Sequence, residues 1–252
     1  MENRIERSLP GVPGKPPPQH GDPGLQEFDL LDRLRREPRY TIAEAARLAG
    51  TSAPFASRWL SAILDAAPAD TARRRSPRAP VASFLDLIEL VVADRLRLGA
   101  EGAPRIPFAR LRTAYQFARK QLAIDRPFAS QRLYRNSPHI FRDLDVSEGG
   151  PGHLAVDLGG QFGLPGPVHE LAAALDFDSL RGLALRWFPA GRDARIVIDP
   201  TIASGRPSIA GRNLQVDLIV ARFRRAGESI DSLAKDLELD RKAVEAAVRF
   251  AA

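Results

Sequence analysis

The sequence contains no cysteine, and it has only four histidines and one methionine in 252 residues. The lack of cysteine excludes disulfides, thiol nucleophiles and thiolate metal sites. No apolar run approaches the roughly 18 residues that a membrane-spanning helix needs. The first seven residues also lack the apolar core of a signal peptide. We therefore expect a cytoplasmic protein that holds no metal or cofactor.

Lysine is also scarce, because only four of the 37 basic residues are lysines. The chain has a net charge of +6, and residues 40–130 alone carry 14 basic and 8 acidic residues. A local excess of arginine suits contacts with phosphates, which supply most non-specific affinity for nucleic acids. Codon usage would produce the same arginine-rich composition, so charge alone leaves both interpretations open.

The pattern of apolar residues predicts a mainly α protein with two helix-turn-helix units. Residues 8–24 contain six prolines, a composition typical of a flexible leader, although a proline ligand for a partner domain is an alternative. The expected divisions are a leader over 1–39, a winged helix-turn-helix domain over 40–130, a connecting segment with short strands and a helix over 131–191, and a small α+β domain with a second helix-turn-helix over 192–252.

Residues 41–64 show the first helix-turn-helix pattern. Apolar residues recur at helical spacing from Ile42 to Ala49, behind a capping-box signature at Thr41, and Gly50 ends the helix. Ser52 is a plausible cap for a second helix, over 53–64. Residues at the start and on the outer face of this second helix are the ones that would contact DNA. They are Ser52, Pro54, Ser57 and Arg58.

Residues 65–80 have no helical period and suit a wing or arm that contacts phosphates through Arg73, Arg74, Arg75 and Arg78. Two more helices follow, the first behind another capping-box signature at Ser83 and Asp86. The second has an apolar stripe from Phe108 to Leu122. That stripe fits an intramolecular core, with a dimer seam as the alternative.

The second half of the chain mixes short strands and helices. We expect strands at 153–158, 183–188 and 195–199, a helix over 168–175, and a short extended piece at 208–210 between tight turns. Helices then follow near 216–223 and 230–237. A shift of 188 positions aligns the second of these with the helix that starts at Ile42, which predicts a second helix-turn-helix. Its outer face includes Lys242, Glu245 and Ala246, so binding of a partner or dimerisation competes with DNA binding there.

Two parts of the sequence resemble known families. The run from Tyr40 to Ser52, Trp59 with Leu60, and the run from Ser83 to Leu90 resemble the winged helix-turn-helix domain of MerR-type regulators. The segments 195–200, 204–213, 226–230 and 244–250 resemble, in order and spacing, a small antitoxin-like domain of bacterial toxin–antitoxin operons. Taken together, the chain resembles a long VapB-type antitoxin.

This resemblance implies a homodimer that binds duplex operator DNA, represses its own operon and neutralises a PIN-like ribonuclease toxin encoded beside it. Such a toxin is acidic at its metal site, and guanidinium groups grip carboxylates well. Arg206 and Arg212, on a turn rich in glycine and proline, are therefore the candidate toxin contacts. The alternative is that they pair with Asp193, Asp199 or Asp217 in their own domain.

Two other functions compete with the antitoxin. One is a stand-alone MerR-like transcription regulator whose C-terminal domain dimerises or senses a ligand. The other is a hydrolase, for which the sequence offers few candidates. The acidic and histidine residues of the middle segment lack the spacing of a metal or nucleophile motif, so we expect no catalytic residues and no enzyme. Those residues are Asp157, His169, Glu170, Asp176 and Asp178.

Overall fold

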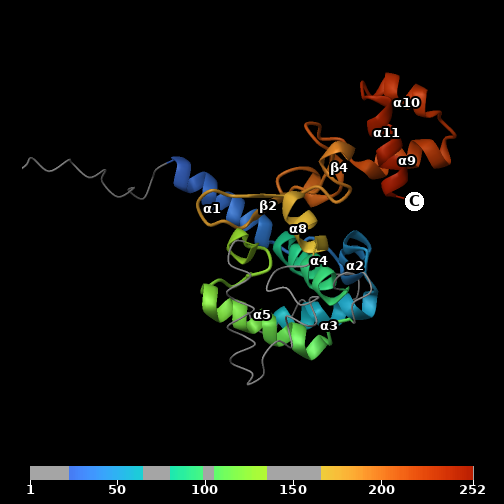
Figure 1. Cartoon of the computed structure of the whole chain (residues 1–252). Coiled ribbons are helices and arrows are strands. Elements are labelled where there is room, and N and C mark those ends of the chain that lie inside the picture. Colours follow the sequence, from blue (N-terminus) through green and yellow to red (C-terminus); the bar gives the residue numbers. More distant parts are fainter. Residues whose placement is uncertain (1–22, 65–79, 99–104, 135–165, 252) are drawn as a thin grey trace, which may run out of the picture.

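The structure, a computed structural model, describes residues 23–64, 80–98, 105–134 and 166–251 (Figure 1). As expected, it is mainly helical, with two small antiparallel sheets in its second half. The helices are α1 (Pro23–Arg36), α2 (Ile42–Ala49), α3 (Ala53–Leu64), α4 (Phe84–Leu98), α5 (Phe108–Leu122), α8 (Gly166–Ala173), α9 (Val216–Arg225), α10 (Ile230–Asp236) and α11 (Arg241–Phe250). The strands are β1 (Leu175–Phe177), β2 (Ala184–Trp187), β3 (Ile196–Val197) and β4 (Ser208–Ile209).

Helix α4 is the centre of the larger hydrophobic core, which we call the main core. Most of its side chains are buried, from Phe84 to Leu96, and it contacts α1, α2, α3, α5 and α8, which surround it in Figure 1. A helix that is apolar on nearly every face must be covered on every side. The position of α4 therefore explains why five other helices of the described chain pack around it.

The first helix-turn-helix forms as the sequence predicts. The Thr41 hydroxyl accepts a hydrogen bond from the backbone N–H of Glu44, and the Glu44 carboxylate accepts one from the backbone N–H of Thr41, which completes the capping box. Gly50 ends α2 in the left-handed region, with φ 66°. The turn is then fixed to α4, because the Thr51 hydroxyl donates to Asp94 at 2.7 Å.

The C-terminal unit, residues 196–251, has its own smaller core. Strands β3 and β4 pair antiparallel, and α9, α10 and α11 pack around a centre that includes Ile219, Leu233 and Val244. Helices α10 and α11 agree with the second helix-turn-helix pattern of the sequence. The unit joins the main core through an antiparallel β-bridge between Trp187 and Ile198.

No helix of the described residues is long and apolar enough to cross a membrane.

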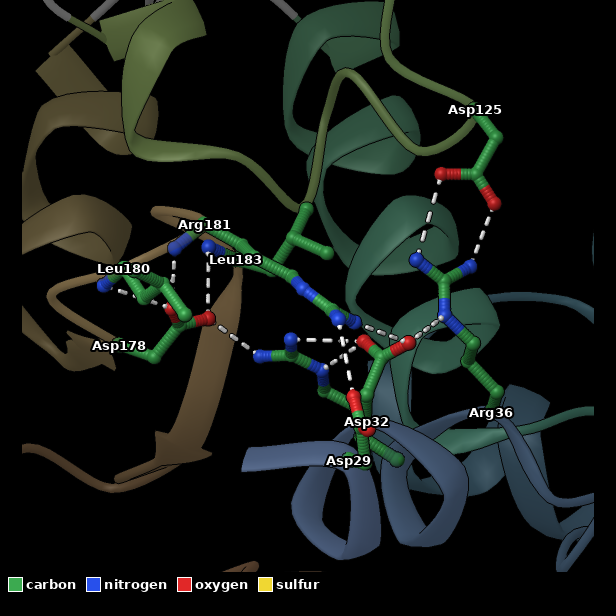
Figure 2. A network of polar contacts seen from close by, with 9 residues as sticks. Asp29, Asp32, Arg36, Asp125, Asp178, Leu180, Arg181 and Leu183 are labelled. Atoms are coloured by element: carbon green, nitrogen blue, oxygen red, sulfur yellow. Dashed lines mark hydrogen bonds and ion pairs between the residues drawn. The ribbon is translucent and has the colours of Figure 1, made fainter. Parts of the chain in front are cut away.

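The structure differs in detail from two of the expected segments. We expected residues 23–36 in the flexible leader, but they form α1, and among its side chains from 26 to 36 only that of Arg35 is buried. Ion pairs attach this helix to the rest of the molecule (Figure 2): Arg35 pairs with Asp178 at 2.5 Å and Arg36 with Asp125 at 2.5 Å. Asp178 and Asp125 are distant from α1 in the sequence, so the composition of residues 23–36 does not predict these ion pairs.

The segment 131–191 is more than a connection, because its described part belongs to the main core. Leu133, Val168, Leu183 and Trp187 are buried there with residues of α4 and α5. Leu175 starts β1 instead of ending a helix, and β1 pairs antiparallel with β2. The remaining expectations for 1–22, for the arm at 65–79 and for a strand at 153–158 lie outside the described residues.

Candidate functional site

The first candidate surface is the outer face of α3. Ala56, Trp59, Leu60 and Ile63 on the inner face are buried in the main core. The predicted DNA contacts lie on the other side and near the start of the helix: Ser52, Pro54 and Arg58 are exposed and Ser57 is half-buried. The structure therefore brings the four residues together at the start and on the first turns of one helix, the end that enters a major groove in DNA-binding helix-turn-helix proteins.

Arg58 has a partner that the sequence analysis missed. Its guanidinium carbon lies 3.9 Å from the centre of the Phe108 ring, at the start of α5. Stacking on a ring fixes the guanidinium plane by a cation–π contact and leaves the N–H groups at its edge free to donate. Phe108 is 50 positions from Arg58 in the sequence, and its place in an apolar stripe predicts a core residue instead of a contact with arginine. The pair holds Arg58 in place before any ligand binds.

The aromatic rings beneath α3 make its position rigid. Trp59 stacks on Phe128 with 5.8 Å between ring centres and meets Tyr115 edge-on at 5.4 Å. Such aromatic pairs add to the free energy gained from burial. Ser52 has a local role as well, since its hydroxyl oxygen accepts from the backbone N–H of Phe55 at 3.4 Å and caps the helix. Its hydroxyl proton remains available to donate to a phosphate.

The predicted wing contacts, Arg73, Arg74, Arg75 and Arg78, lie outside the described residues. The apolar stripe of α5 is part of the main core, because Leu111, Tyr115 and Ala118 are buried among residues of this chain. The sequence left open whether this stripe forms an intramolecular core or a dimer seam, and the structure shows the intramolecular core. The stripe is therefore not the dimer seam.

The second candidate surface is the turn at 203–213 in the C-terminal unit. Ala203, Ser204, Gly205 and Gly211 all have positive φ, between 47° and 78°, so the turn has a specific, restricted backbone shape. It presents the side chains of Arg206 and Arg212, which are 55% and 51% exposed.

Arg206 has one of the partners expected within its own domain, whereas Arg212 has a different one. Arg206 lies 3.9 Å from Asp217, a long and exposed pair of the expected kind. Arg212 instead donates to the backbone carbonyl of Glu238 at 3.2 Å. Asp199 is occupied by Thr201, whose hydroxyl donates to it at 2.6 Å. Because exposed pairs of this kind are weak, both guanidinium groups remain free to exchange partners.

The turn at 203–213 contacts the helix-turn-helix through Tyr40. The Tyr40 hydroxyl donates to the carbonyl of Gly205 at 2.7 Å, and burial raises the pKa of this phenol, which keeps it protonated as a donor. Beside this bond lies a cavity of about 320 Å³ whose lining includes Arg47 from α2 and Arg206 from the turn. A larger one, of about 590 Å³, lies between α11 and the segment 190–194.

Two of the acidic residues of the middle segment, Asp176 and Asp178, have structural roles. Asp176 pairs with Arg186 and Arg192. Burial alone would raise the pKa of Asp178, but hydrogen bonds from the backbone N–H of Arg181 and from the Arg35 guanidinium lower it overall. Glu170 is exposed, whereas Asp157 and the side chain of His169 lie outside the described residues. Asp178 thus anchors α1 as a carboxylate.

The second candidate surface lies in a segment that is similar to a known sequence family. Residues 196–251 match the family described as "Protein of unknown function (DUF433)". No curated protein matches the chain. The X-ray crystal structure of Rv2018 from Mycobacterium tuberculosis superposes with a TM-score of 0.69 at 21% sequence identity, covering 85% of this chain and 99% of Rv2018. The C-terminal unit is therefore similar in sequence to the DUF433 family, and the chain is similar in fold to Rv2018.

Proposed function

We propose that this chain is a DNA-binding antitoxin and autorepressor of a type II toxin–antitoxin operon. Its helix-turn-helix, of MerR type, reads duplex operator DNA through α3, and its C-terminal unit neutralises a PIN-like ribonuclease. It acts in the cytoplasm and performs no catalysis of its own. The observation that carries the proposal is the presence of two separate arginine-bearing surfaces, one on α3 and one on the turn at 203–213, each held rigidly by the fold.

The geometry of α3 supports the DNA-binding part. A recognition helix needs a buried inner face, an exposed outer face and side chains that donate hydrogen bonds to base edges. Helix α3 has the first two, and Arg58 and Ser57 supply the donors. Arg73, Arg74, Arg75 and Arg78 follow α3 in the sequence and are proposed to bind phosphates beside it.

The turn at 203–213 supports the toxin-binding part. A ribonuclease of PIN type presents carboxylates at its metal site, and an arginine can bind a carboxylate through two parallel hydrogen bonds. Arg206 and Arg212 are half-exposed on a backbone that is already ordered. A rigid turn loses little conformational entropy on binding.

Co-expression with the ribonuclease encoded beside the chain's own gene tests the proposal. The wild-type chain should restore growth, whereas the double variant Arg206→Ala with Arg212→Ala should not. The matched control is Arg225→Ala, which removes an exposed arginine of α9 that makes no ion pair or hydrogen bond with the described residues. Melting curves of the purified variants show whether each one is folded. A folded double variant that still protects the cells would contradict the assignment of these two residues.

We also propose a homodimer, because one helix-turn-helix reads a half-site and two-fold operators match two-fold proteins. The apolar stripe of α5 is already buried, so the seam must lie elsewhere on the chain. Light scattering at micromolar concentration should report twice the mass of one chain. A single-chain mass both free and on DNA would contradict the dimer.

A second function has one observation in its favour. The cavity of about 590 Å³ between α11 and residues 190–194 is large enough for a small molecule. It would suit a stand-alone MerR-like regulator whose C-terminal unit senses a ligand. Absence of a ribonuclease gene beside this one would favour that function over the antitoxin.

A further inference from the structure

The exposed face of α5 has an unusual charge pattern. The helix contains four basic residues and no aspartate or glutamate. Its buried side, with Leu111 and Tyr115, belongs to the main core. Apart from Pro107 and Ala109, the described residues of the helix and of the three positions before it that remain in solvent are polar or basic. They are Arg105, Arg112, Gln116 and Lys120.

Three of these side chains have no partner within the described part of the chain. Arg105, Arg112 and Lys120 make no ion pair or hydrogen bond there. Some arginines elsewhere in the molecule are matched by acids: the half-buried Arg222 pairs with Glu228 at 2.6 Å, and the exposed Arg241 contacts Glu245 at 2.8 Å, one helical turn away. An ordinary solvated helix face mixes both charge signs. The α5 face therefore keeps a positive charge that nothing in the described chain neutralises.

This face continues the outer face of α3. Phe108, on which Arg58 of α3 stacks, is followed at i+4, i+8 and i+12 by Arg112, Gln116 and Lys120, and residues four apart lie on the same side of a helix. Phe108 also meets Phe55 and Trp59 of α3 edge-on, and Figure 1 shows the two helices side by side at one end of the molecule. A stripe of donors thus runs from Arg58 along α5.

We propose that the exposed face of α5 is a second DNA contact, which grips the phosphate backbone beside the segment read by α3. The inference rests on the proposed DNA-binding function and names residues that neither the wing nor α3 includes. Arg112 and Lys120 are eight residues apart, or about 12 Å along a helix, roughly three to four base-pair steps of duplex DNA at 3.4 Å each. These charges contact phosphates only, so they add affinity and register without choosing a sequence.

The double variant Arg112→Ala with Lys120→Ala tests the proposal, with Arg33→Ala and Lys235→Ala as a control that removes the same two charges from α1 and α10. Fluorescence anisotropy is recorded on a duplex from the region upstream of the chain's own gene and on a shuffled duplex, over a range of salt concentrations. Two lost phosphate contacts should flatten the slope of log affinity against log salt by about 1.8. The affinity at 0.1 M salt should fall between about tenfold and a hundredfold on both duplexes.

Each outcome separates the surface on α5 from the DNA-binding function itself. If the wild-type chain binds the duplexes and the α5 variant keeps both affinity and salt slope, the α5 contact is overturned and the function stands. If the wild-type chain binds no duplex DNA, both the DNA-binding function and the α5 contact are overturned. A loss no larger than that of the control, or a loss confined to single-stranded RNA, overturns the proposal. The melting temperatures of both double variants should stay at the wild-type value, because all four substituted side chains are exposed. Arg112→Lys in place of Arg112→Ala should restore most of the lost affinity for DNA.

Discussion

The Tyr40 hydroxyl donates a hydrogen bond of 2.7 Å to the carbonyl oxygen of Gly205, across 165 positions of the sequence. Tyr40 directly precedes the cap of α2, and Gly205 directly precedes Arg206. The bond therefore connects the start of the helix-turn-helix with the turn that carries the proposed toxin contacts.

Gly205→Ala should be strongly destabilising. A Cβ at this position would lie 2.6 Å from the Tyr40 hydroxyl oxygen, and the backbone has φ 75°. Gly191→Ala is the matched control, because Gly191 has φ 80° and open space around it; it should cost only about 1 kcal/mol of the free energy of unfolding, for the backbone alone. Urea unfolding should show the larger loss for Gly205→Ala, and part of the excess should disappear in a Tyr40→Phe background. Equal losses for the two glycines would show that the close approach to Tyr40 is not important.

The buried pair Arg35–Asp178 should account for most of the attachment of α1. Asp178→Asn leaves the buried Arg35 guanidinium with Asp32, at 2.7 Å, as its remaining carboxylate partner, so the loss should stay below the about 3–5 kcal/mol typical of a buried charge left without any partner. Asp29→Asn is the control, since Asp29 is 72% exposed and its pair with Arg181 should contribute less than about 1 kcal/mol. Hydrogen exchange of residues 23–36 measures the result. Unchanged protection of α1 in Asp178→Asn would contradict this account.

Glu89 should make the protein less stable as pH rises. Burial raises the pKa of this carboxyl to about 8, although the charge of Arg126 acts to lower it. Between the unfolded pKa of about 4.3 and 8, the folded chain holds a proton that the unfolded chain has lost. The contribution of Glu89 to the free energy of unfolding should therefore fall by up to about 1.4 kcal/mol per pH unit in this window and level off above it.

Glu89→Gln tests this pH dependence, because the amide oxygen can still accept from the backbone N–H groups of Phe128 and Ala129 but does not titrate. Urea unfolding at pH 5.5, 7 and 8.5 should give a flatter profile for the variant and a stability above wild type at pH 8.5. Parallel profiles for the two proteins would show that Glu89 titrates normally.

Arg58→Ala should lower sequence preference more than overall affinity. A good arginine contact to a base discriminates by about 1–3 kcal/mol, so the ratio of affinities for operator and shuffled duplexes should fall by roughly fivefold to 150-fold. Phe108→Leu should reduce the same ratio by less, because it leaves the guanidinium in place but removes the ring that orients it. A uniform loss on both duplexes would make Arg58 a phosphate contact instead of a base contact.

The parts of the fold that could be predicted depend on local sequence. The capping boxes at Thr41 and Ser83 and the left-handed Gly50 are formed by residues within three or four positions of one another, and all are present in the structure. The helices of the C-terminal unit follow from apolar spacing in the same way. Local hydrogen bonds and helical periodicity are visible in the sequence without knowledge of tertiary contacts.

The parts that could not be predicted depend on distant partners. Helix α1 has no buried apolar side chain among those described, and its anchors are carboxylates at Asp125 and Asp178. The position of Phe108 beneath Arg58 likewise requires α3 and α5 to be adjacent. The α5 stripe was correctly seen as apolar, but only the structure shows that its buried face belongs to this chain and that its other face is basic.

Inhibition of the neighbouring ribonuclease in solution tests the central claim most directly. The purified ribonuclease is titrated with the full-length chain, and RNA cleavage is followed at each molar ratio. The account predicts that cleavage falls to background near a fixed stoichiometric ratio for the wild-type chain and for Arg225→Ala, and that it persists with Arg206→Ala and Arg212→Ala combined. Full ribonuclease activity in the presence of excess folded wild-type chain would contradict the antitoxin function.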